Sequence, residues 1–231
     1  ENSTILDVAK KISEGLARVA TCGEIDGEVK DLRYEITKDC NLTIHTFDSS
    51  LDGKKAYWHT TSHIMAQAVK RLFPGVKFAI GPSIDNGFYY DFDVEKPFTD
   101  EDKEKIEAEM KKIIKENLPI ERFVLPKDEA LKLMEGQPYK QELINDLPEG
   151  EEIDFYKQGD FTDLCAGPHL VSTGKVKAIK ILSSSFCLNS ASVVLLLLNT
   201  IWSPCLVVNT AATSYKLSPE ADVFVNTLAI V

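Results

Sequence analysis

The sequence predicts an α+β fold, and three observations favour it. Apolar residues recur at helical spacing over residues 5–16 and again over residues 101–117. Short strand-like runs occur around residues 22–29 and 42–47, and a hairpin turn signal follows Ile25. The 231 residues, 44% hydrophobic and 27% charged, have the composition of an ordinary soluble globular protein with one large or two small domains. The net charge of −10 argues against a broad nucleic-acid-binding surface, so any such contact needs a local basic patch.

The first segment, residues 1–47, is predicted to be a small α+β unit. Thr4 is a suitable N-cap for the helix over residues 5–16, and the two strand-like runs complete the unit. The polar, turn-rich run over residues 48–53 is interpreted as a linker to a second domain.

A helix is predicted over residues 59–73, because Pro74-Gly75 stops it. One side of this helix is apolar and consists of Ile64, Met65, Ala68 and Leu72. His59 and His63 lie one turn apart on the other side. We therefore expect the two histidines to act together and to lie off the stripe that is buried in the core.

The remaining regular elements follow from capping and turn signals. Thr99 and the acidic residues after it open an amphipathic helix over residues 101–117, which Pro119 ends. A shorter helix over residues 127–134 ends at Gly136-Gln137-Pro138. Strands are predicted at residues 78–80, 87–92, 153–157 and 175–182.

Residues 183–231 form a tail of different character. Its 49 residues contain only three charges: Lys216, Glu220 and Asp222. Its apolar centre, residues 193–208, is too short and too interrupted for a membrane span, and we assign no secondary structure to the tail. The five cysteines show no regular spacing and the chain opens without a basic-then-apolar leader, so we expect a reducing compartment and no signal peptide.

Two short pairs concentrate the chemistry of the chain. His59 and His63 form an HxxxH pair, and Cys165 and His169 form a CxxxH pair, so three of the four histidines are involved. Imidazole and thiolate are ligands for zinc and groups that transfer protons near neutral pH. One cysteine and three histidines suffice for a closed structural zinc site and equally for a site that keeps a water, and both interpretations stay open. A metalloprotease helix would have Glu after the first histidine, where this chain has Thr60.

These pairs, with a long insertion between them, resemble the editing domain shared by threonyl- and alanyl-tRNA synthetases. The run over residues 79–92, AIGPSIDNGFYYDF, and Tyr139-Lys140 are similar to the threonyl enzymes in particular. The preceding segment resembles their TGS domain without its first strand, and the resemblance spans residues 5–182. It implies a ubiquitin-like TGS unit over residues 1–47 and a two-layer α+β editing domain with a mainly antiparallel sheet over residues 48–182. Residues 183–231 have no such resemblance.

The activity implied by the resemblance is proofreading, in which serine wrongly attached to threonine tRNA is hydrolysed. The positions that match the family's site are His59, His63, Lys140, Asp163, Cys165 and His169. The resemblance implies that His59 and Lys140 position or activate a water beside the terminal ribose, while His63, Cys165 and His169 shape the pocket for serine. Asp163 lies in the same space.

The cofactors and partners expected from the resemblance are few. We expect editing without an obligatory metal, although zinc at His59, His63, Cys165 and His169 stays an alternative. ATP belongs to the aminoacylation core, which is not recognisable here and through which the parent enzymes are expected to dimerise. The expected partner is the acceptor end of threonine tRNA, in the cytoplasm and away from membranes. The rival hypotheses are a non-catalytic module that binds tRNA or another partner, and a structural zinc domain.

Overall fold

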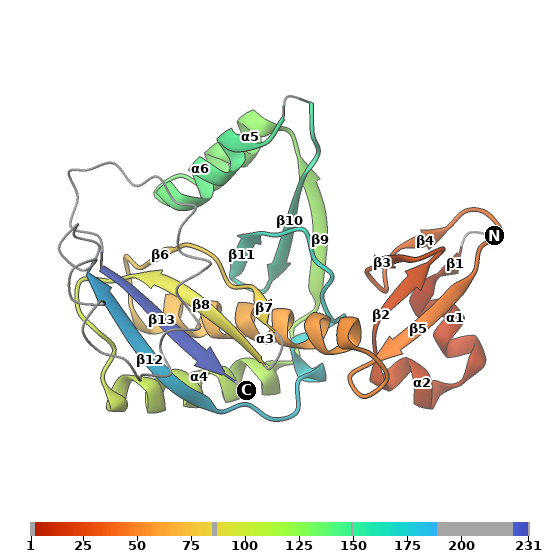
Figure 1. The fold of residues 1–231 in the computed structure, drawn as a ribbon, viewed down its shortest axis with the longest axis horizontal. Helices are drawn as coiled ribbons and strands as arrows, with labels where there is room; N and C mark the ends of the chain where they lie inside the picture. Colours follow the sequence, from red (N-terminus) through yellow and green to blue (C-terminus); the bar gives the residue numbers. More distant parts are fainter. Residues whose placement is uncertain (1–2, 85–86, 149, 189–223, 231) are drawn as a thin grey trace, which may run out of the picture.

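The computed structural model describes residues 3–84, 87–148, 150–188 and 224–230. Its strands pair in antiparallel fashion in four separate sheets, and its helices pack against them, so the predicted α+β class is confirmed. Figure 1 shows the small N-terminal unit on one side and the larger mixed unit on the other. None of the helices in the described residues combines the length and the apolar character that a membrane crossing needs.

The N-terminal unit contains two small sheets and two short helices. The elements are β1 (Ser3–Thr4), α1 (Ile5–Ile12), α2 (Glu14–Val19), β2 (Ala20–Ile25), β3 (Glu28–Lys30), β4 (Glu35–Ile36) and β5 (Leu42–Thr46). The predicted hairpin turn is confirmed, because Asp26 and Gly27 both have positive φ between β2 and β3. The helix predicted over residues 5–16 is two helices, because Ser13 is extended and its side chain caps α2 at Leu16.

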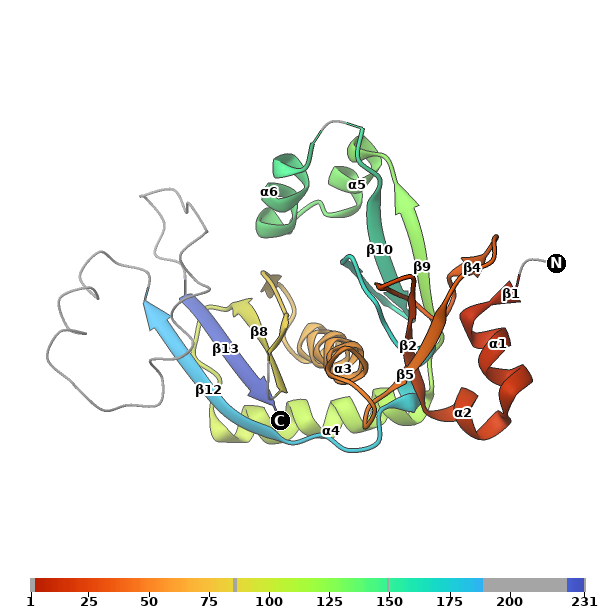
Figure 2. The same cartoon turned by 45° about the vertical axis from the view of Figure 1, so that its right-hand side comes forward.

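The larger unit is built around α3 (Leu51–Leu72), which runs between two sheets (Figure 2). One sheet has the order β12-β13-β8-β6, with β7 paired to β8; the other has the order β11-β10-β9. These strands are β6 (Lys77–Phe78), β7 (Ser83–Ile84), β8 (Gly87–Asp93), β9 (Ile120–Leu125), β10 (Ile153–Gln158), β11 (Phe161–Leu164), β12 (Ile181–Leu188) and β13 (Phe224–Ile230). The helices packed around them are α4 (Asp100–Glu116), α5 (Lys127–Leu133) and α6 (Pro138–Asp146).

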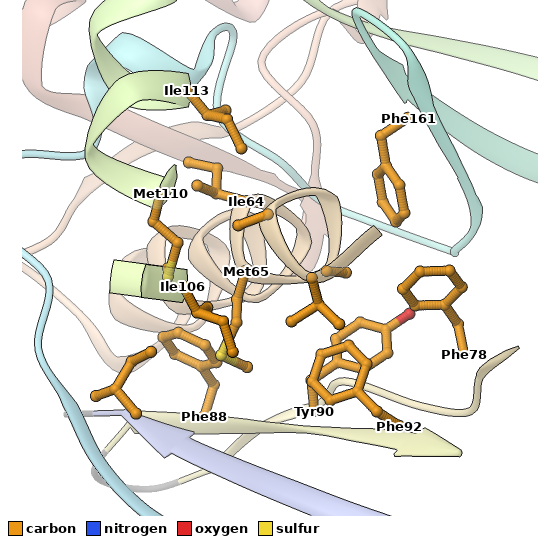
Figure 3. Close-up of a cluster of buried hydrophobic side chains, with 14 of the residues drawn as sticks. Ile64, Met65, Phe78, Phe88, Tyr90, Phe92, Ile106, Met110, Ile113 and Phe161 are labelled. Carbon is orange, nitrogen blue, oxygen red and sulfur yellow. The ribbon is translucent and has the colours of Figure 1, made fainter. Parts of the chain in front are cut away.

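The main core lies where α3, α4 and the β8 sheet meet (Figure 3). Ile64 and Met65 of α3, Ile106 and Met110 of α4, and Phe88 of β8 are all at most 1% exposed. Because this packing clamps α3 along one side, the helix has a fixed position for the side chains on its opposite side.

The linker expected over residues 48–53 is wrong, because α3 begins at Leu51. Ser50 is its N-cap, and its hydroxyl accepts a hydrogen bond from the Gly53 N–H. A Cβ at Gly53 would lie 2.0 Å from the carbonyl oxygen of Thr46, so the glycine lets the first turn approach β5 closely. The N-terminal unit therefore joins α3 through a cap.

Two further segments differ from their predictions. The expected strand over residues 175–182 is a short 3₁₀ turn, Thr173–Lys175, followed by β12 from Ile181. The reason is tertiary, because the Thr173 hydroxyl donates to the carbonyl of Ile113 and accepts from the N–H of Leu118 at the end of α4. Residues 136–138, which were predicted to end a helix, also begin another one, because Pro138 is the first residue of the unpredicted helix α6.

The tail, to which no structure was assigned, contributes two strands. β12 runs through the expected boundary at residue 182 to Leu188, and β13 pairs with both β12 and β8. Residues 189–223, which include the whole apolar centre of the tail, lie outside the described residues.

Candidate functional site

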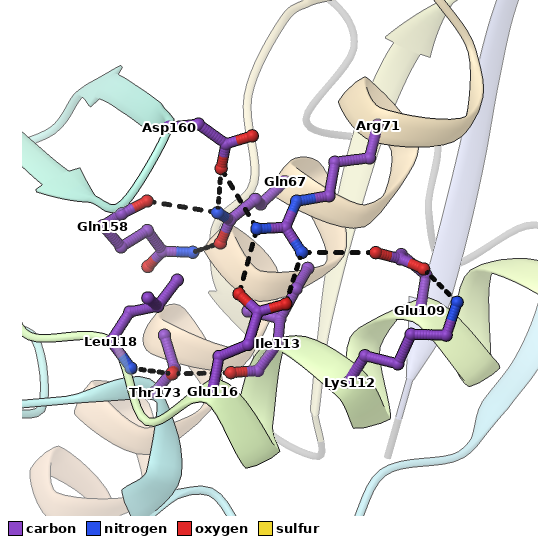
Figure 4. Close-up of polar contacts among 10 residues, drawn as sticks. All are labelled: Gln67, Arg71, Glu109, Lys112, Ile113, Glu116, Leu118, Gln158, Asp160 and Thr173. Atoms are coloured by element: carbon purple, nitrogen blue, oxygen red, sulfur yellow. Dashed lines mark hydrogen bonds and ion pairs between the residues drawn. The ribbon is translucent and has the colours of Figure 1, made fainter.

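The polar side of α3 is also packed against protein, so His63 is buried although it lies off the apolar stripe as predicted, whereas His59 is half-buried. His63 is 3% exposed, and Gln67, one turn further, is fully buried. This side of α3 faces β10 and the turn into β11, where Gln67 exchanges hydrogen bonds with Gln158 (Figure 4). Arg71, at the next turn, binds Glu109, Glu116 and Asp160. Because its apolar side and its polar side are both packed against protein, α3 has no exposed stripe at its centre.

The loop after β11 brings the second pair to the first. Cys165 Sγ lies 3.2 Å from His59 Nε2 and 3.1 Å from His169 Nε2. The ring of His169 lies 4.3 Å from that of His59 and 4.2 Å from that of His63, measured between centroids. The two short pairs therefore form one cluster, although 106 residues separate His59 from Cys165.

A buried ion pair lies against this cluster. Lys140 Nζ of α6 is 2.7 Å from Asp163 Oδ1 of β11, and each side chain is 4% exposed. The other oxygen of Asp163 accepts a 2.7 Å hydrogen bond from the Tyr90 hydroxyl and lies 3.7 Å from His63 Nε2. All six residues expected at the site are therefore brought together, and the contact between Asp163 and His63 joins the ion pair to the histidines.

The electrostatics keep the imidazoles neutral. Burial lowers the pKa of His63 to about 4, with Asp163 opposing the shift and Lys140 adding to it. Burial and the neighbouring His63 lower the pKa of His59 to about 3. Burial and the other two histidines place the pKa of His169 well below its usual value. All three rings are therefore unprotonated at pH 7 and can accept a proton or a hydrogen bond.

The charged groups of the site are Lys140 and Asp163. Burial alone would raise the pKa of Asp163, but the Lys140 ammonium, His63 and the Tyr90 hydroxyl outweigh it, so the pKa is lowered. Burial raises the pKa of Cys165 to about 12, so this thiol is protonated and is no nucleophile at pH 7. The site thus combines three neutral imidazoles, which can accept a proton, with the Lys140 ammonium, whose charge Asp163 balances.

A cleft of about 330 Å³ reaches this ion pair from the surface. Lys140, Asp163 and Phe161 line it, together with Gln137 and Glu135 from the loop before α6. A second cleft, of about 350 Å³, is lined chiefly by aromatic residues such as Phe47 and Tyr57 and does not touch the six residues. Of the six residues, Lys140 and Asp163 therefore line the first cleft.

Several residues at the site were missed from the sequence. The Thr60 hydroxyl lies 3.2 Å from His169 Nδ1 and accepts a 2.9 Å hydrogen bond from the Leu170 N–H. Asp31 and Arg33, from the N-terminal unit, bind the backbone of residues 169–170. Thr60 could have been found from its place between the histidines, and Tyr90 from the run over residues 79–92, but no local signal marks Asp31 or Arg33.

The donor set of the cluster fits zinc. One ligand atom from each of His59, His63, Cys165 and His169 lies within 4.8 Å of all the others. The contact of Thr60 with His169 Nδ1 leaves Nε2 directed at Cys165, as the outer-shell partner of a metal-bound histidine does. The fourth histidine, His45, lies elsewhere, 3.1 Å from Glu24 Oε2 in the N-terminal unit.

Comparisons with known proteins support the resemblance. Residues 1–46 match the family described as the TGS domain, and residues 153–188 match the threonyl and alanyl tRNA synthetase second additional domain. A threonine–tRNA ligase of Acetivibrio thermocellus is 67% identical over 185 residues, which are 79% of this chain and 29% of that protein. Threonine–tRNA ligases of Caldanaerobacter subterraneus and Clostridium perfringens are 63% and 60% identical over 182 residues, with 28% of each covered. The chain thus spans less than a third of the length of these relatives.

Proposed function

We propose that this chain, which carries a TGS domain and a threonyl- and alanyl-type second additional domain and resembles threonine–tRNA ligases over most of its length, is an editing hydrolase. Its proposed substrate is serine esterified to threonine tRNA. The observation that carries the proposal is the meeting of a lysine–aspartate ion pair, which lines a cleft, and a cluster of three neutral imidazoles that contacts this pair through His63.

The chemistry is hydrolysis of an ester. In this proposal the oxygen of a water attacks the carbonyl carbon, the bond from that carbon to the ribose oxygen breaks, and serine and the free tRNA end are released. His59, which is unprotonated at pH 7, accepts a proton from the attacking water and passes it to the leaving ribose oxygen. The Lys140 ammonium stabilises the negative charge that develops on the carbonyl oxygen, while Asp163 holds that ammonium in place.

Selection between serine and threonine is a matter of one methyl group. A pocket that accepts threonine cannot reject the smaller serine by more than about 10–200-fold, so a second site that excludes the larger residue is useful. We propose that His63, Cys165 and His169 form the wall that meets the extra methyl group. Their mutual contacts, 3.1 Å for Cys165 and His169 and 4.2 Å between the two imidazole rings, leave this wall little freedom to move.

The test is deacylation of seryl- and threonyl-tRNA(Thr) by the whole chain. We expect the seryl ester to be cleaved much faster, and His59→Ala to lower that rate by about 10²-fold or more, as expected for the loss of a general base. His45→Asn is the matched control, because His45 contacts Glu24 far from the cluster. Equal rates for the parent chain and His59→Ala, or no deacylation by the parent, would reject the proposal; the second result favours a module that binds tRNA without cleaving it.

A structural zinc domain is the second candidate, favoured by the fit of the four donor atoms. The ligands would be His59, His63, Cys165 and His169, and the ion would supply closed tetrahedral coordination that stabilises the fold. Metal analysis of the purified chain, followed by melting with and without a chelator, distinguishes this candidate. Stoichiometric zinc whose removal lowers the melting temperature supports it, and metal-free protein with an unchanged melting curve rejects it.

The partner and location follow from the substrate. We propose that the chain meets the acceptor end of threonine tRNA in the cytoplasm, where the free thiols of Cys22, Cys40 and Cys165 persist. Dimerisation and ATP-dependent charging are proposed only for the full-length relatives.

A further inference from the structure

The loop that carries Cys165 and His169 is held by the N-terminal unit. The His169 N–H donates a 3.2 Å hydrogen bond to Asp31 Oδ2. The guanidinium of Arg33 donates to the carbonyls of His169, at 3.3 Å, and Leu170, at 2.7 Å. Both backbone groups of His169 are therefore bound by residues more than 130 positions earlier in the chain.

Asp31 is itself fixed in several directions. Its two oxygens accept hydrogen bonds from Arg33 Nη1 at 2.7 and 2.9 Å, and from the Arg33 N–H at 2.9 Å. The Tyr156 hydroxyl of β10 donates to Asp31 Oδ2 at 3.2 Å, and the Tyr156 ring lies 4.4 Å from the His169 ring. The Asp31 side chain is only 9% exposed, so these contacts are shielded from competing water.

Further contacts determine where the His169 imidazole lies. Thr60 of α3 meets its Nδ1 and Cys165 meets its Nε2, so the ring is fixed between α3 and its own loop. The regular elements end at Leu164 of β11 and resume at Thr173, so between them the backbone of this loop depends on contacts from outside. Asp31 and Arg33 supply such contacts at His169, which touches both other histidines and the thiol.

We infer that Asp31 and Arg33 are positioning residues for the hydrolytic site, which is thus completed by the N-terminal unit. The inference rests on the proposed ester hydrolysis, and it gives the TGS domain a part in the chemistry without contact with the reacting atoms. Loss of either residue is expected to displace the loop and with it the wall formed by Cys165 and His169. A displacement of about 1 Å in an active site can lower the rate by about 10²-fold.

The kinetic test uses Asp31→Asn and Arg33→Lys in the whole chain. Asp31→Asn removes the negative charge and one of the two oxygens that accept from Arg33 and His169, and the lysine introduced by Arg33→Lys keeps the charge but loses the planar fork that spans two carbonyls. We expect each variant to lower the single-turnover rate of seryl-tRNA(Thr) deacylation by about 10–100-fold, with little change in the concentration of tRNA that gives half the maximal rate. Glu28→Gln is the control, because Glu28 belongs to the same unit and pairs with Lys30 at the surface.

A second readout does not depend on activity. Cys165 Sγ accepts a hydrogen bond from the Gly167 N–H and contacts His59 and His169, so a displaced loop exposes the thiol. We expect iodoacetamide to label Cys165 at least about fivefold faster in Asp31→Asn and Arg33→Lys, because partial opening of the loop exposes the thiol. Mass spectrometry of the peptides identifies the modified cysteine. Labelling of the buried Cys22 serves as the internal reference for unfolding.

The outcomes separate this inference from the proposed function. If the parent chain deacylates its substrate and both variants match it in rate and in Cys165 labelling, the inference is wrong and the function stands. If the parent chain is inactive, the function fails, while faster Cys165 labelling in the variants still shows that Asp31 and Arg33 order the loop. A lower melting temperature with unchanged rate and labelling of the folded variants shows a purely structural contact and also overturns the inference.

Discussion

Removal of the Lys140 ammonium tests how the buried charges of the site are balanced. Lys140 Nζ and Asp163 Oδ1 are 2.7 Å apart and both side chains are 4% exposed. At an effective dielectric constant of about 20, two unit charges at this distance attract each other by about 6 kcal/mol. Transfer of the two ions from water costs several kcal/mol each, so the pair as a whole contributes little net stability.

Lys140→Met keeps the length of the side chain but leaves the Tyr90 hydroxyl as the one hydrogen-bond donor to the Asp163 carboxylate within the described part of the chain. We expect this variant to lose about 3–5 kcal/mol of unfolding free energy at pH 7, the usual cost of an uncompensated buried charge. The pKa of Asp163 should then rise above its unfolded value. A group with a raised folded pKa loses its contribution as pH rises, so the deficit should shrink below about pH 5.

The double variant Lys140→Met/Asp163→Asn removes both charges and keeps an acceptor for the Tyr90 hydroxyl. We expect it to be more stable than Lys140→Met, with a loss of only about 1–3 kcal/mol from the unpaired amide group. Urea unfolding followed by far-ultraviolet circular dichroism measures both. Lys105→Met, which removes an exposed i,i+4 pair with Glu101, serves as control and should show no measurable change. A double variant at least as unstable as the single one would refute this account of the pair.

Three shorter predictions concern the same elements. Because the pKa of His63 falls from 6.5 in the unfolded chain to about 4 in the fold, metal-free protein should lose about 3 kcal/mol through this group between pH 6.5 and 4, and His63→Gln should remove that part of the pH dependence in urea titrations. Thr60→Val leaves His169 Nδ1 and the Leu170 N–H without their partner, so we expect a loss of about 1–3 kcal/mol in the same titration, whereas an unchanged midpoint would show that these contacts are dispensable. Gly53→Ala sets a Cβ 2.0 Å from the Thr46 carbonyl oxygen and should cost about 1–3 kcal/mol, with a melting temperature lower by several degrees; a stabilised variant would contradict the close packing of α3 on β5.

The elements predicted correctly are those whose signals are local. Helix α4 begins at the Thr99 capping box and ends at Asn117, which adopts the left-handed conformation typical of a helix end. The β2–β3 turn follows from Asp26-Gly27, and β10 from its own composition. For α4 and the β2–β3 turn, residues within a few positions satisfy the backbone groups that the element leaves unpaired, so one sequence window contains the necessary information.

The surroundings of the polar side of α3 were predicted wrongly. The spacing of apolar residues along a helix does not show whether its polar side faces water or polar groups of the protein. Gln67 has the pattern of an exposed residue, yet it is fully buried against Gln158. The same holds for His63, whose neighbour Asp163 comes from a strand 100 residues later. A polar stripe on a central helix therefore predicts polar contacts, and only the tertiary structure determines whether water or protein supplies them.

The six site residues lie together because they stabilise one another, and no local sequence signal shows this. Three buried imidazoles would repel Lys140 if they were protonated, and the lowered pKa values of His59 and His63 prevent this. The ammonium in turn requires Asp163, whose second oxygen the Tyr90 hydroxyl satisfies. Each group is thus tolerable in the interior only in the presence of the others. The set is therefore stable as a unit, and it combines neutral proton acceptors with a cation that lines a cleft, the combination that ester hydrolysis needs.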